Sequence, residues 1–492
     1  MCLAVAACAS DWKPLAAPIE PAHRVGSGVR IAVAAADAAQ LEDLIAVLAG
    51  KQLDLAAAAT PIAATEHQLS AIAGQLPLGP VAVAWAPDGK LLATATLGKA
   101  NLALAIGKLG GPACAVAWPI KSGTAQASVA AQVGLGGGVA VVLSEPTAST
   151  LTLGAVADSD QCLQGLPVGT KEFVDQQVRQ AVHAAWAPLL GAAALKVVRA
   201  LVPASLVVSG SGPVTGAIAP AAAVRISMAY GQEPGPSVFA AQAGFATAGL
   251  QFAIDADRHP CAPDVAPPKV VTAAALAPTA SPTAKAVLRR ALVVDHAALQ
   301  HTVWALARAG AWCRQSRWPL AAGVPAGWAS ATAPALAKWA DDAPPVARLW
   351  PHTDVEVDLA DSPAGPVLQW QFADASLEIV GSVGGVPATL LVLRGHIRGT
   401  MRPIITAGTQ LTWLPESGSA QSAVVTSPLA GGTVAANAEP LGKLVAAAIE
   451  AIFTPAPVLP LAAVLPAGTV ATSVTRAGNA LWLWLDGGLA QP

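Results

Sequence analysis

Acidic side chains alternate with apolar ones along one short segment of the chain. The acidic residues are Asp354, Glu356 and Asp358, with Asp361 just beyond. Alternate residues of a strand share one face, and three carboxylates on one face could bind calcium outside a cell. The residues between them are Val355, Val357 and Leu359. This alternation is typical of a strand with one buried and one solvated face, so we predict a solvated face and no metal site.

Two further patterns resemble parts of catalytic sites. The glycine-rich segment 210–216 leads into a strand-like run, whereas phosphate binding needs a following helix. His296 and His301 are five residues apart and no Glu follows the first, so they do not form a zinc-protease helix. The chain has no G-x-S-x-G motif of a serine hydrolase. We therefore predict a protein that is not an enzyme and uses no cofactor.

The segment Leu3–Ala9 resembles a bacterial lipobox, in which small residues precede a cysteine that becomes acylated. Only seven residues precede Cys8, fewer than a charged region and a full apolar region of a signal peptide need. Either the true start lies upstream or the match is due to chance. We expect lipidation at Cys8, which would tether an exported protein to a membrane by its acyl chains.

Four other cysteines also indicate an exported protein. They are Cys114, Cys162, Cys261 and Cys313. Four cysteines allow three pairings, and the local one joins Cys114 to Cys162 and Cys261 to Cys313. No C-x-x-C motif is present, which argues against zinc binding and thioredoxin-type redox chemistry. We favour disulfides in an exported protein, with buried free thiols in a cytosolic protein as the alternative.

The composition is unusually apolar. Hydrophobic residues make up 54% of the chain and charged residues only 12%, against roughly 25% charged residues in ordinary soluble domains. The net charge is -2 and the 28 Lys and Arg residues are scattered, so no basic stripe for nucleic acid is visible. Charged residues and prolines interrupt the apolar stretches 181–202 and 444–465, so neither is a plausible spanning helix. The chain therefore either buries a large core or keeps apolar surface for an apolar partner.

The second half of the sequence repeats the order of elements of the first half at an offset of about 260 residues. A strand-like run at 30–33 leads into a helical pattern at 38–50, and a run at 291–294 leads into one at 297–310. A later helical pattern ends near Pro203 in the first half and near Pro466 in the second. The repeated order predicts two domains of one fold.

Between the helices, alternating or β-branched runs predict strands at 81–85, 206–209 and 367–372, with turn signals such as Pro87–Gly89 between runs. Each half is therefore expected to be α+β, with an antiparallel sheet, a helix near its start and a long helix near its end. The expected parts are a lipobox and tether at 1–27, a first domain at 28–265, a linker at 266–285 and a second domain at 286–492.

The helical patterns carry apolar stripes at i, i+3, i+4 and i+7 spacing. The stripes of the early helices contain Leu41, Leu44, Ile45 and Leu48 in the first half and Leu299, Val303 and Leu306 in the second, with Trp304 beside them. The stripes of the late helices contain Val174, Val178, Ala181, Val182 and Ala185 in the first half and Leu444, Val445, Ala448, Ile449 and Ile452 in the second. Such stripes predict faces that pack against a sheet, most often as ordinary core.

The duplicated order of strand, helix, hairpins, long helix, proline and terminal strands resembles the tubular lipid-binding superfamily. This superfamily includes bactericidal permeability-increasing protein, lipopolysaccharide-binding protein and cholesteryl ester transfer protein. The segment Val293–Gly310 and the closing runs Val464–Thr469 and Leu481–Leu485 are similar to segments of bacterial members. The resemblance implies a boat-shaped pair of domains, each a strongly curved antiparallel sheet wrapped around a long helix, with lipid tails held between sheet and helix.

The resemblance also implies which residues contact lipid. They are Leu41, Leu44, Ile45, Leu48, Val178, Val182, Leu299, Val303, Trp304, Leu306, Val445 and Ile449. Basic residues are too sparse for the cationic tip with which some members grip lipopolysaccharide, so that specificity is not implied.

We therefore expect a lipoprotein of the bacterial cell envelope, anchored to the outer membrane and either periplasmic or surface-exposed, that binds or transfers lipids without covalent chemistry. The alternative is a structural or adhesive envelope lipoprotein with no ligand cavity.

Overall fold

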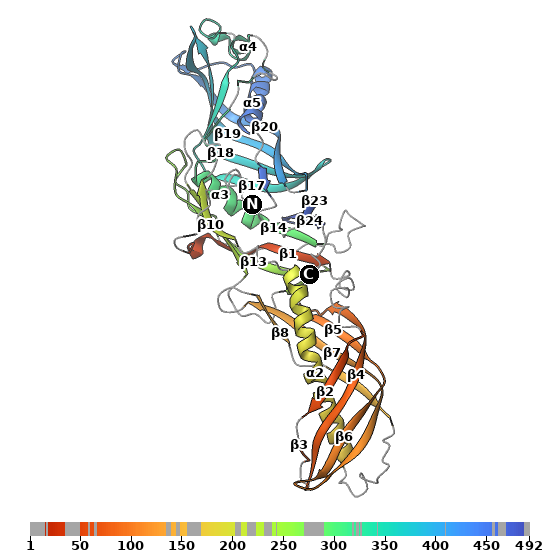
Figure 1. Cartoon of the computed structure of the whole chain (residues 1–492). Helices are drawn as coiled ribbons and strands as arrows, with labels where there is room; N and C mark the ends of the chain where they lie inside the picture. The colour runs from red at the N-terminus through yellow and green to blue at the C-terminus, as the bar shows by residue number, and fades with distance from the viewer. Residues whose placement is uncertain are drawn as a thin grey trace. The chain divides into compact units, whose positions relative to one another are not determined.

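The chain is mostly β, with few helices. The computed structural model describes residues 15, 18–34, 50–57, 60–62, 66–133, 139–143, 148–154, 169–201, 208–213, 223–230, 239–242, 244–269, 290–316, 319–320, 324, 327–341, 343–408, 410–454, 458–460 and 469–486. The described strands form three antiparallel sheets (Figure 1). The predicted helix at 38–50 lies outside the described residues except for Gly50, which is in a turn.

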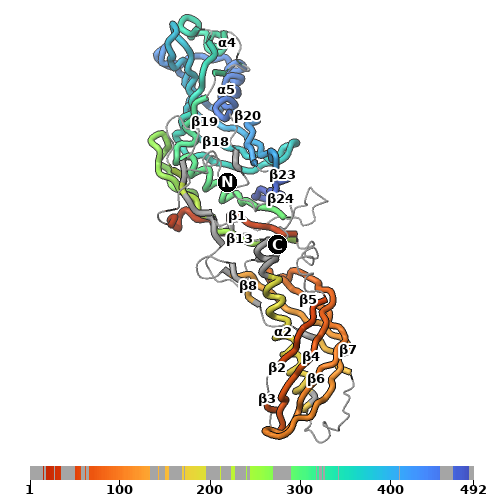
Figure 2. The backbone as a smooth tube through the Cα atoms, in the orientation of Figure 1, coloured from red at the N-terminus to blue at the C-terminus, as the bar shows by residue number. Residues whose placement is uncertain are grey.

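Two compact units make up the chain. A larger unit contains residues 1–32, 205–231 and 249–492, and a smaller unit contains residues 33–204 and 232–248. In the backbone trace of Figure 2, the strand at 24–34 and the strand at 480–486 belong to one sheet, with the strand at 290–295 between them. The domain boundaries expected at residues 28, 265 and 286 stay a prediction.

The sheet of the smaller unit is a meander of long strands. Its strands are β2 (Gln52–Ala57), β3 (Thr60–Pro61), β4 (His67–Trp85), β5 (Leu91–Leu97), β6 (Ala100–Lys108), β7 (Ala113–Val133), β8 (Val139–Leu143) and β9 (Ala148–Leu153). Strands β5 and β6 continue one another, because both pair with β4 on one side and with β7 on the other. Short strands occupy the two edges, with β2 and β3 on β4 and with β8 and β9 on β7.

Local sequence explains the first hairpin of this sheet. Buried and less buried residues alternate along β5, as a strand with one face on a core requires. The chain reverses at Pro87–Gly89, where Gly89 has a φ of 79° and the carboxylate of Asp88 accepts a hydrogen bond from the backbone of Lys90 at 3.2 Å. The strand predicted at 81–85 and the turn predicted after it are both confirmed.

The large sheet of the larger unit follows the same plan. Its strands are β15 (Arg314–Gln315), β16 (Val346–Pro351), β17 (Val355–Ser362), β18 (Gly365–Val383), β19 (Val386–Thr406), β20 (Gln410–Ser427), β21 (Gly432–Thr433) and β22 (Val458–Pro460). Three long strands, β18, β19 and β20, form the centre. Short strands again occupy the edges, with β16 and β17 on β18 and with β21 and β22 on β20. The duplication predicted from the sequence is therefore visible in the strand order.

The third sheet combines strands from both halves of the sequence. Its strands are β1 (Arg24–Ala34), β10 (Val208–Pro213), β11 (Ala223–Tyr230), β12 (Phe239–Gln242), β13 (Phe245–Ala256), β14 (Arg290–Asp295), β23 (Val470–Ala477) and β24 (Ala480–Asp486). Strand β1 of the first half lies between β13 and β14, and β14 pairs with β24. The two early strands of the repeat, β1 and β14, are therefore neighbours in one sheet.

The described helices include three that match predicted patterns, the two late ones and the early one of the second half, and three short ones that were not predicted. They are η3 (Pro21–His23), α2 (Thr170–Leu201), α3 (His296–Arg308), α4 (Trp328–Thr332), η7 (Pro334–Leu336) and α5 (Ala438–Ile452). Asp295 starts α3, because its side chain accepts a hydrogen bond from the backbone N–H of Ala297 at 2.9 Å. None of the described helices combines the length and the hydropathy that crossing a bilayer requires.

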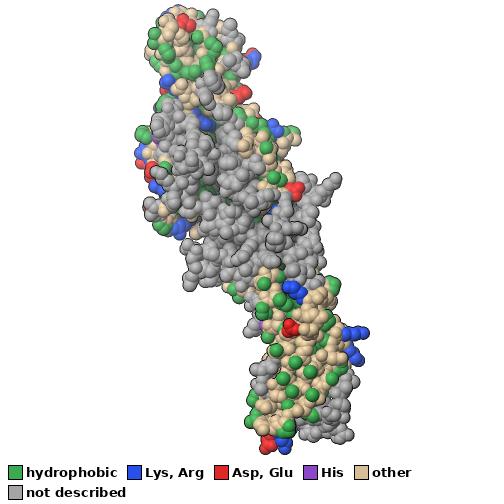
Figure 3. Space-filling model, in the orientation of Figure 1, with side chains coloured by type: hydrophobic (Ala, Val, Ile, Leu, Met, Phe, Trp, Pro, Cys, Tyr) green, Lys and Arg blue, Asp and Glu red, His purple; other side chains and the backbone are tan. Residues whose placement is uncertain are grey.

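Figure 3 shows how the charged side chains of the described residues are distributed on one face of the molecule. On the face that Figure 3 shows, Lys and Arg side chains lie interspersed with Asp and Glu, and they do not gather into one basic patch. This distribution agrees with the scattered basic residues of the sequence.

Two glycines of the large sheet allow close packing on its inner face. A Cβ at Gly418 would lie 2.7 Å from Cβ of Ile449 in α5, and a Cβ at Gly399 would lie 2.5 Å from the Trp370 ring. Both distances are too short for carbon atoms, so α5 and Trp370 can reach the sheet only where these side chains are absent.

We expect Gly418→Ala to lower the free energy of unfolding by about 1–3 kcal/mol, because the methyl group overpacks the contact with Ile449. Gly432→Ala is the control, since no atom lies within 4 Å of a Cβ there, and it should stay within about 0.5 kcal/mol of wild type. Urea denaturation measures both variants. Equal stabilities of the two would contradict this account of the packing.

Candidate functional site

The long helix α2 closes the sheet of the smaller unit. It contacts β2 at one edge of the sheet and β8 and β9 at the other, as well as β4 and β7 between them. The two edges are not paired with each other in the described part of the chain. The sheet therefore curves around α2. The helix fills the gap between the two edges, which hydrogen bonds between edge strands would otherwise close.

The inner face of α2 is apolar along its described length. Its buried residues include Val174, Val178, Ala181, Val182, Trp186, Leu190, Ala193 and Ala194. Val178 and Val182, which we predicted to contact lipid, have exposed fractions of 0%. Arg179 lies beside this face and ties the helix to an edge strand, because its guanidinium donates to the carbonyl of Leu151 at 3.4 Å.

Helix α5 has the same relation to the large sheet of the larger unit. It contacts β20 and also β16, which lies beside the two-residue edge strand β15, and it contacts α4 as well. Its buried residues are Leu444, Val445, Ala448, Ile449 and Ile452. The apolar stripe predicted for this helix is confirmed as its buried face, which includes the expected lipid contacts Val445 and Ile449.

Helix α3 protects an exposed edge of the same sheet. The side chain of Gln300 donates to the carbonyl of Val355 at 2.9 Å and accepts from the N–H of Val357 at 3.0 Å. Nε2 of His296 lies 2.7 Å from the carbonyl oxygen of Val357. These bonds satisfy the free edge of β17, which would otherwise be open to another strand. Sequence analysis missed this role, although spacing of i and i+4 places His296 and Gln300 on one helix face.

The predicted lipid contacts of α3 are all buried. They are Leu299, Val303, Trp304 and Leu306. The helix packs against β14 and β17, and Trp304 lies 5.2 Å from the ring of His23 and 5.7 Å from the guanidinium of Arg308. The other predicted contacts, Leu41, Leu44, Ile45 and Leu48, lie outside the described residues. A lipid-binding role of all these residues stays a prediction.

An aromatic cluster lies near the end of α5. Its rings belong to Trp312, Trp370, Phe372 and Phe453, with centroids 5.4–5.9 Å apart. The guanidinium of Arg314 lies 5.3 Å from the ring of Phe453. Burial beside these rings lowers the pKa of Arg314 to about 10, so the side chain remains a cation at neutral pH. No local sequence pattern marks this cluster, because its members come from three separate segments of the chain.

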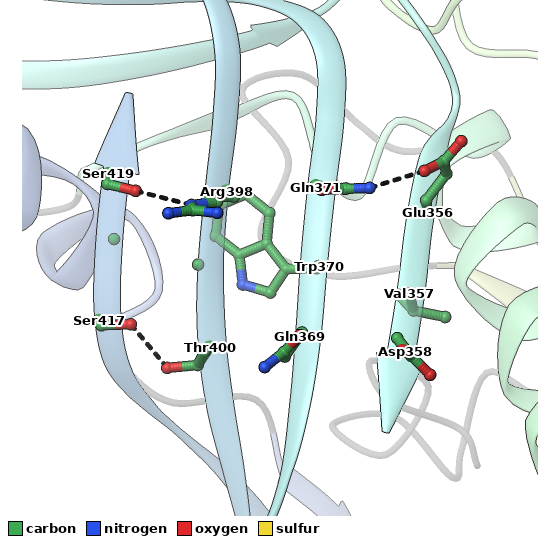
Figure 4. A pocket seen from close by; sticks show the side chains of 12 residues that line it. Glu356, Val357, Asp358, Gln369, Trp370, Gln371, Arg398, Thr400, Ser417 and Ser419 are labelled. Atoms are coloured by element: carbon green, nitrogen blue, oxygen red, sulfur yellow. Dashed lines mark hydrogen bonds between the residues drawn. The ribbon is translucent and has the colours of Figure 1, made fainter. Parts of the chain in front are cut away.

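A polar groove crosses the outer face of the large sheet (Figure 4). Its volume is about 650 Å³, within the usual range of ligand sites. One wall is the cross-strand row Glu356, Gln371, Arg398 and Ser419, and the other is the row Asp358, Gln369, Thr400 and Ser417. Register shifts next to these rows bend the sheet and so shape the groove.

The walls of the groove are held by hydrogen bonds along each row. Gln371 donates to Glu356 at 2.7 Å, and the hydroxyls of Thr400 and Ser417 are 2.8 Å apart. The residues Val355, Val357 and Leu359 are buried, while Glu356 and Asp358 are exposed. The predicted solvated face is therefore confirmed at Glu356 and Asp358, whereas Asp354 is half-buried. The polarity of this face makes the groove unsuited to hydrocarbon. The apolar faces of α2 and α5 remain the candidate site for an apolar ligand.

No family model and no curated protein matches the chain. Among solved structures, the chain is similar to a crystal structure of lipopolysaccharide binding protein, with a TM-score of 0.41 and 11% identity over 94% of this chain and 99% of that chain. It is also similar to P47 of Clostridium botulinum E1 and A2, with TM-scores of 0.29 and 0.27, 7% identity and coverage of 94% of this chain and 98% of those chains. These TM-scores are too low to decide the function, which has to be argued from this chain's own geometry.

One of the two expected disulfides is present between described residues. Cys261 and Cys313 are bonded, with their Cα atoms 6.4 Å apart. Cys114 is also disulfide-bonded, and Cys162 lies outside the described residues. A disulfide is typical of proteins that fold in an oxidising compartment, which agrees with the expected export.

The acidic strand contains one carboxyl group with a strongly altered pKa. Burial raises the pKa of Asp354 to about 6, and the nearby charge of Glu356 adds to this, while a hydrogen bond from the N–H of Val355 opposes it. The folded protein therefore binds more protons at this group than the unfolded chain between about pH 4 and pH 6. Its stability contribution is present below this window and is lost as pH rises through it.

We expect Asp354→Asn to raise the free energy of unfolding at pH 7 by about 1 kcal/mol, a value discounted for the partial exposure of the group. The amide oxygen keeps the bond to Val355 but carries no charge. The difference from wild type should disappear near pH 4, as measured by urea denaturation across this range. Asp358→Asn, at an exposed position, is the control and should change little. A gain from Asp354→Asn that is the same at pH 4 and pH 7 would refute this explanation.

Proposed function

We propose that the protein binds lipids or other hydrophobic molecules without covalent chemistry, in the apolar space between each curved sheet and its long helix. The observation that carries the proposal is the closure of each sheet by an apolar helix. The edges of the smaller unit's sheet meet α2 through side chains and not through a ladder of backbone hydrogen bonds. Such a closure can separate without breaking a β ladder, so hydrocarbon can enter between helix and sheet.

The chemistry of this space fits an apolar ligand. The buried faces of α2 and α5 consist of Ala, Val, Leu, Ile and Trp side chains. A hydrocarbon chain of about sixteen carbons costs on the order of 12 kcal/mol to expose to water, at roughly 0.8 kcal/mol per CH2 group. An apolar interior removes this cost, and no catalytic group is needed for binding or transfer.

The proposed setting is the envelope of a bacterial cell. Acylation of Cys8 would anchor the protein to the outer membrane, with the body of the chain periplasmic or surface-exposed. Cys8 lies outside the described residues. The disulfide between Cys261 and Cys313 supports export to an oxidising compartment. Mass spectrometry of the mature protein, purified from membranes of a bacterial host, would detect the acyl groups on a peptide that begins at Cys8.

A structural role with a dry core is the second candidate. The observation that favours it is the complete burial of Val178 and Val182 by atoms of the protein itself. A solid core would bury these residues against other side chains and leave no space for lipid. The protein would then serve as a structural or adhesive component of the envelope.

Native mass spectrometry of protein from a bacterial host separates the two candidates. Lipid that stays bound under native conditions and is released on denaturation supports the binding proposal. Absence of lipid, together with no uptake of a fluorescent fatty acid, would show that the interior is dry.

A substitution that fills the interior tests the site itself. If lipid occupies the space beside α2, we expect Val178→Trp to displace it, with loss of most bound fatty acid and little change in stability. If the core is dry, the larger ring has no room, and the free energy of unfolding should fall by about 1–3 kcal/mol or more. Gln176→Trp, at an exposed position of the same helix, is the control. Fluorescence titration and thermal unfolding measure the two effects, and wild-type uptake by Val178→Trp would rule out this site.

A further inference from the structure

Two tight turns of the larger unit meet at the disulfide between Cys261 and Cys313. In the first turn, the N–H of Ala262 donates to the carbonyl of His259 at 2.9 Å. In the second, the N–H of Cys313 donates to the carbonyl of Gly310 at 3.0 Å. The turns are also linked beyond the disulfide, because the N–H of His259 donates to the carbonyl of Arg308 at 2.8 Å. His259, Cys261 and Cys313 are therefore presented from two fixed loops.

The imidazole of His259 points at the disulfide. Its Nδ1 atom lies 2.8 Å from Sγ of Cys261 and accepts a hydrogen bond from the N–H of Cys261 at 3.2 Å. A nitrogen that accepts this bond carries a lone pair on the side of the sulfur, and a disulfide sulfur has no proton to offer it. The contact therefore brings together two electron-pair donors with no hydrogen between them.

The position of the ring is fixed by the opposite turn. Gly310 has a φ of 86°, and a Cβ at this residue would lie 2.6 Å from Cγ of His259. Both the left-handed backbone and the close approach of the ring require glycine here. The ring consequently stays beside the two sulfur atoms.

The three donor atoms lie close enough together to meet at one metal ion once the S–S bond is open. One donor atom each from His259, Cys261 and Cys313 lies within 4.8 Å of the others. Ligands of tetrahedral zinc are about 3.3–3.8 Å apart, given Zn–S and Zn–N bonds of about 2.3 and 2.0 Å. Small side-chain rotations would therefore bring the three donors onto one ion. Two Cys and one His are ligands that zinc prefers, and a water molecule can take the fourth position.

We propose that opening the disulfide turns this cluster into a zinc site formed by His259 Nδ1, Cys261 Sγ and Cys313 Sγ. A dithiol reductant supplies two electrons and two protons, so that the S–S bond becomes two thiols and the reductant becomes a disulfide. Zinc then binds both sulfurs as thiolates and the neutral imidazole, and the two thiol protons are released. The oxidised form cannot bind in this way, because its sulfurs carry no charge.

Replacement of the disulfide by a zinc ion keeps the two turns joined in either redox state. The disulfide holds them in an oxidising environment, and the metal holds them after reduction. The inference is independent of lipid binding, because it rests only on residues of these turns.

Cobalt titration of the full chain tests the site. The protein is reduced with dithiothreitol, freed of reductant under argon and titrated with Co2+, which gives a thiolate-to-cobalt absorption band and is then displaced by Zn2+. We expect one such Co2+ per reduced chain and none for the oxidised protein. The double variant Cys261→Ser and Cys313→Ser, which keeps the remaining cysteines, should lack this band.

A variant of the histidine separates the metal site from a pair of free thiols. Loss of a residue that only hydrogen-bonds to a metal ligand typically lowers metal affinity at least about tenfold. Loss of a direct ligand should lower it at least as much, so His259→Ala should weaken Co2+ binding at least about tenfold. His396→Ala is the control, because its Nε2 atom lies 3.1 Å from Gln371 in the groove. Circular dichroism checks that the reduced chain stays folded.

Three results would overturn the proposal. The first is equal Co2+ binding by reduced wild type and the double cysteine variant. The second is equal affinity of wild type and His259→Ala. The third is loss of the fold on reduction that Zn2+ does not reverse, which would make the disulfide a structural bridge only.

Discussion

Sheet edges that cannot pair with each other are the constraint on which this structure depends. A strand edge presents free N–H and C=O groups that would pair with another chain unless they are covered. In the smaller unit α2 contacts β2 at one edge of the sheet and β8 and β9 at the other, and in the larger unit α5 contacts β16 beside the edge strand β15. At β17 the cover is explicit, because Gln300 and His296 of α3 bond to its backbone. The curvature of the sheets and the apolar faces of the helices follow from this requirement.

The same strands separate two chemical environments. Along β17 and β18 the side chains alternate between an apolar inner face and a polar outer face. Gly399 and Gly418 bring Trp370 and Ile449 close to the backbone on the inner side, while the neighbouring residues Arg398 and Ser419 form a wall of the groove outside. An apolar ligand and a polar ligand would therefore meet opposite faces of one sheet, which is why the interior alone is proposed for lipid.

The third sheet, which contains β1 and β14, shows how the two halves of the sequence are combined. Strands β1 and β14 are neighbours, and each contains a buried arginine, Arg30 and Arg290. Burial lowers the pKa of both, and the charges of Asp295 and Asp486 oppose this for Arg30 and Arg290 respectively. Equivalent arginines at equivalent strands support the duplication. Strands of the first half also belong to the larger unit, so the repeat in sequence and the compact units in space do not have the same limits.

The sequence by itself determined the local features of this protein. Periodicity predicted the buried face of α5 and the alternation of β17, and the turn-forming residues predicted the turn at Pro87–Gly89. Each of these features depends on residues a few positions apart. Only the tertiary structure decided the aromatic cluster around Trp370, the edge contacts of Gln300 and the contact of His259 with the disulfide. Those contacts join residues from separate segments of the chain, and no local pattern encodes which segments become neighbours when the strands curve around their helices.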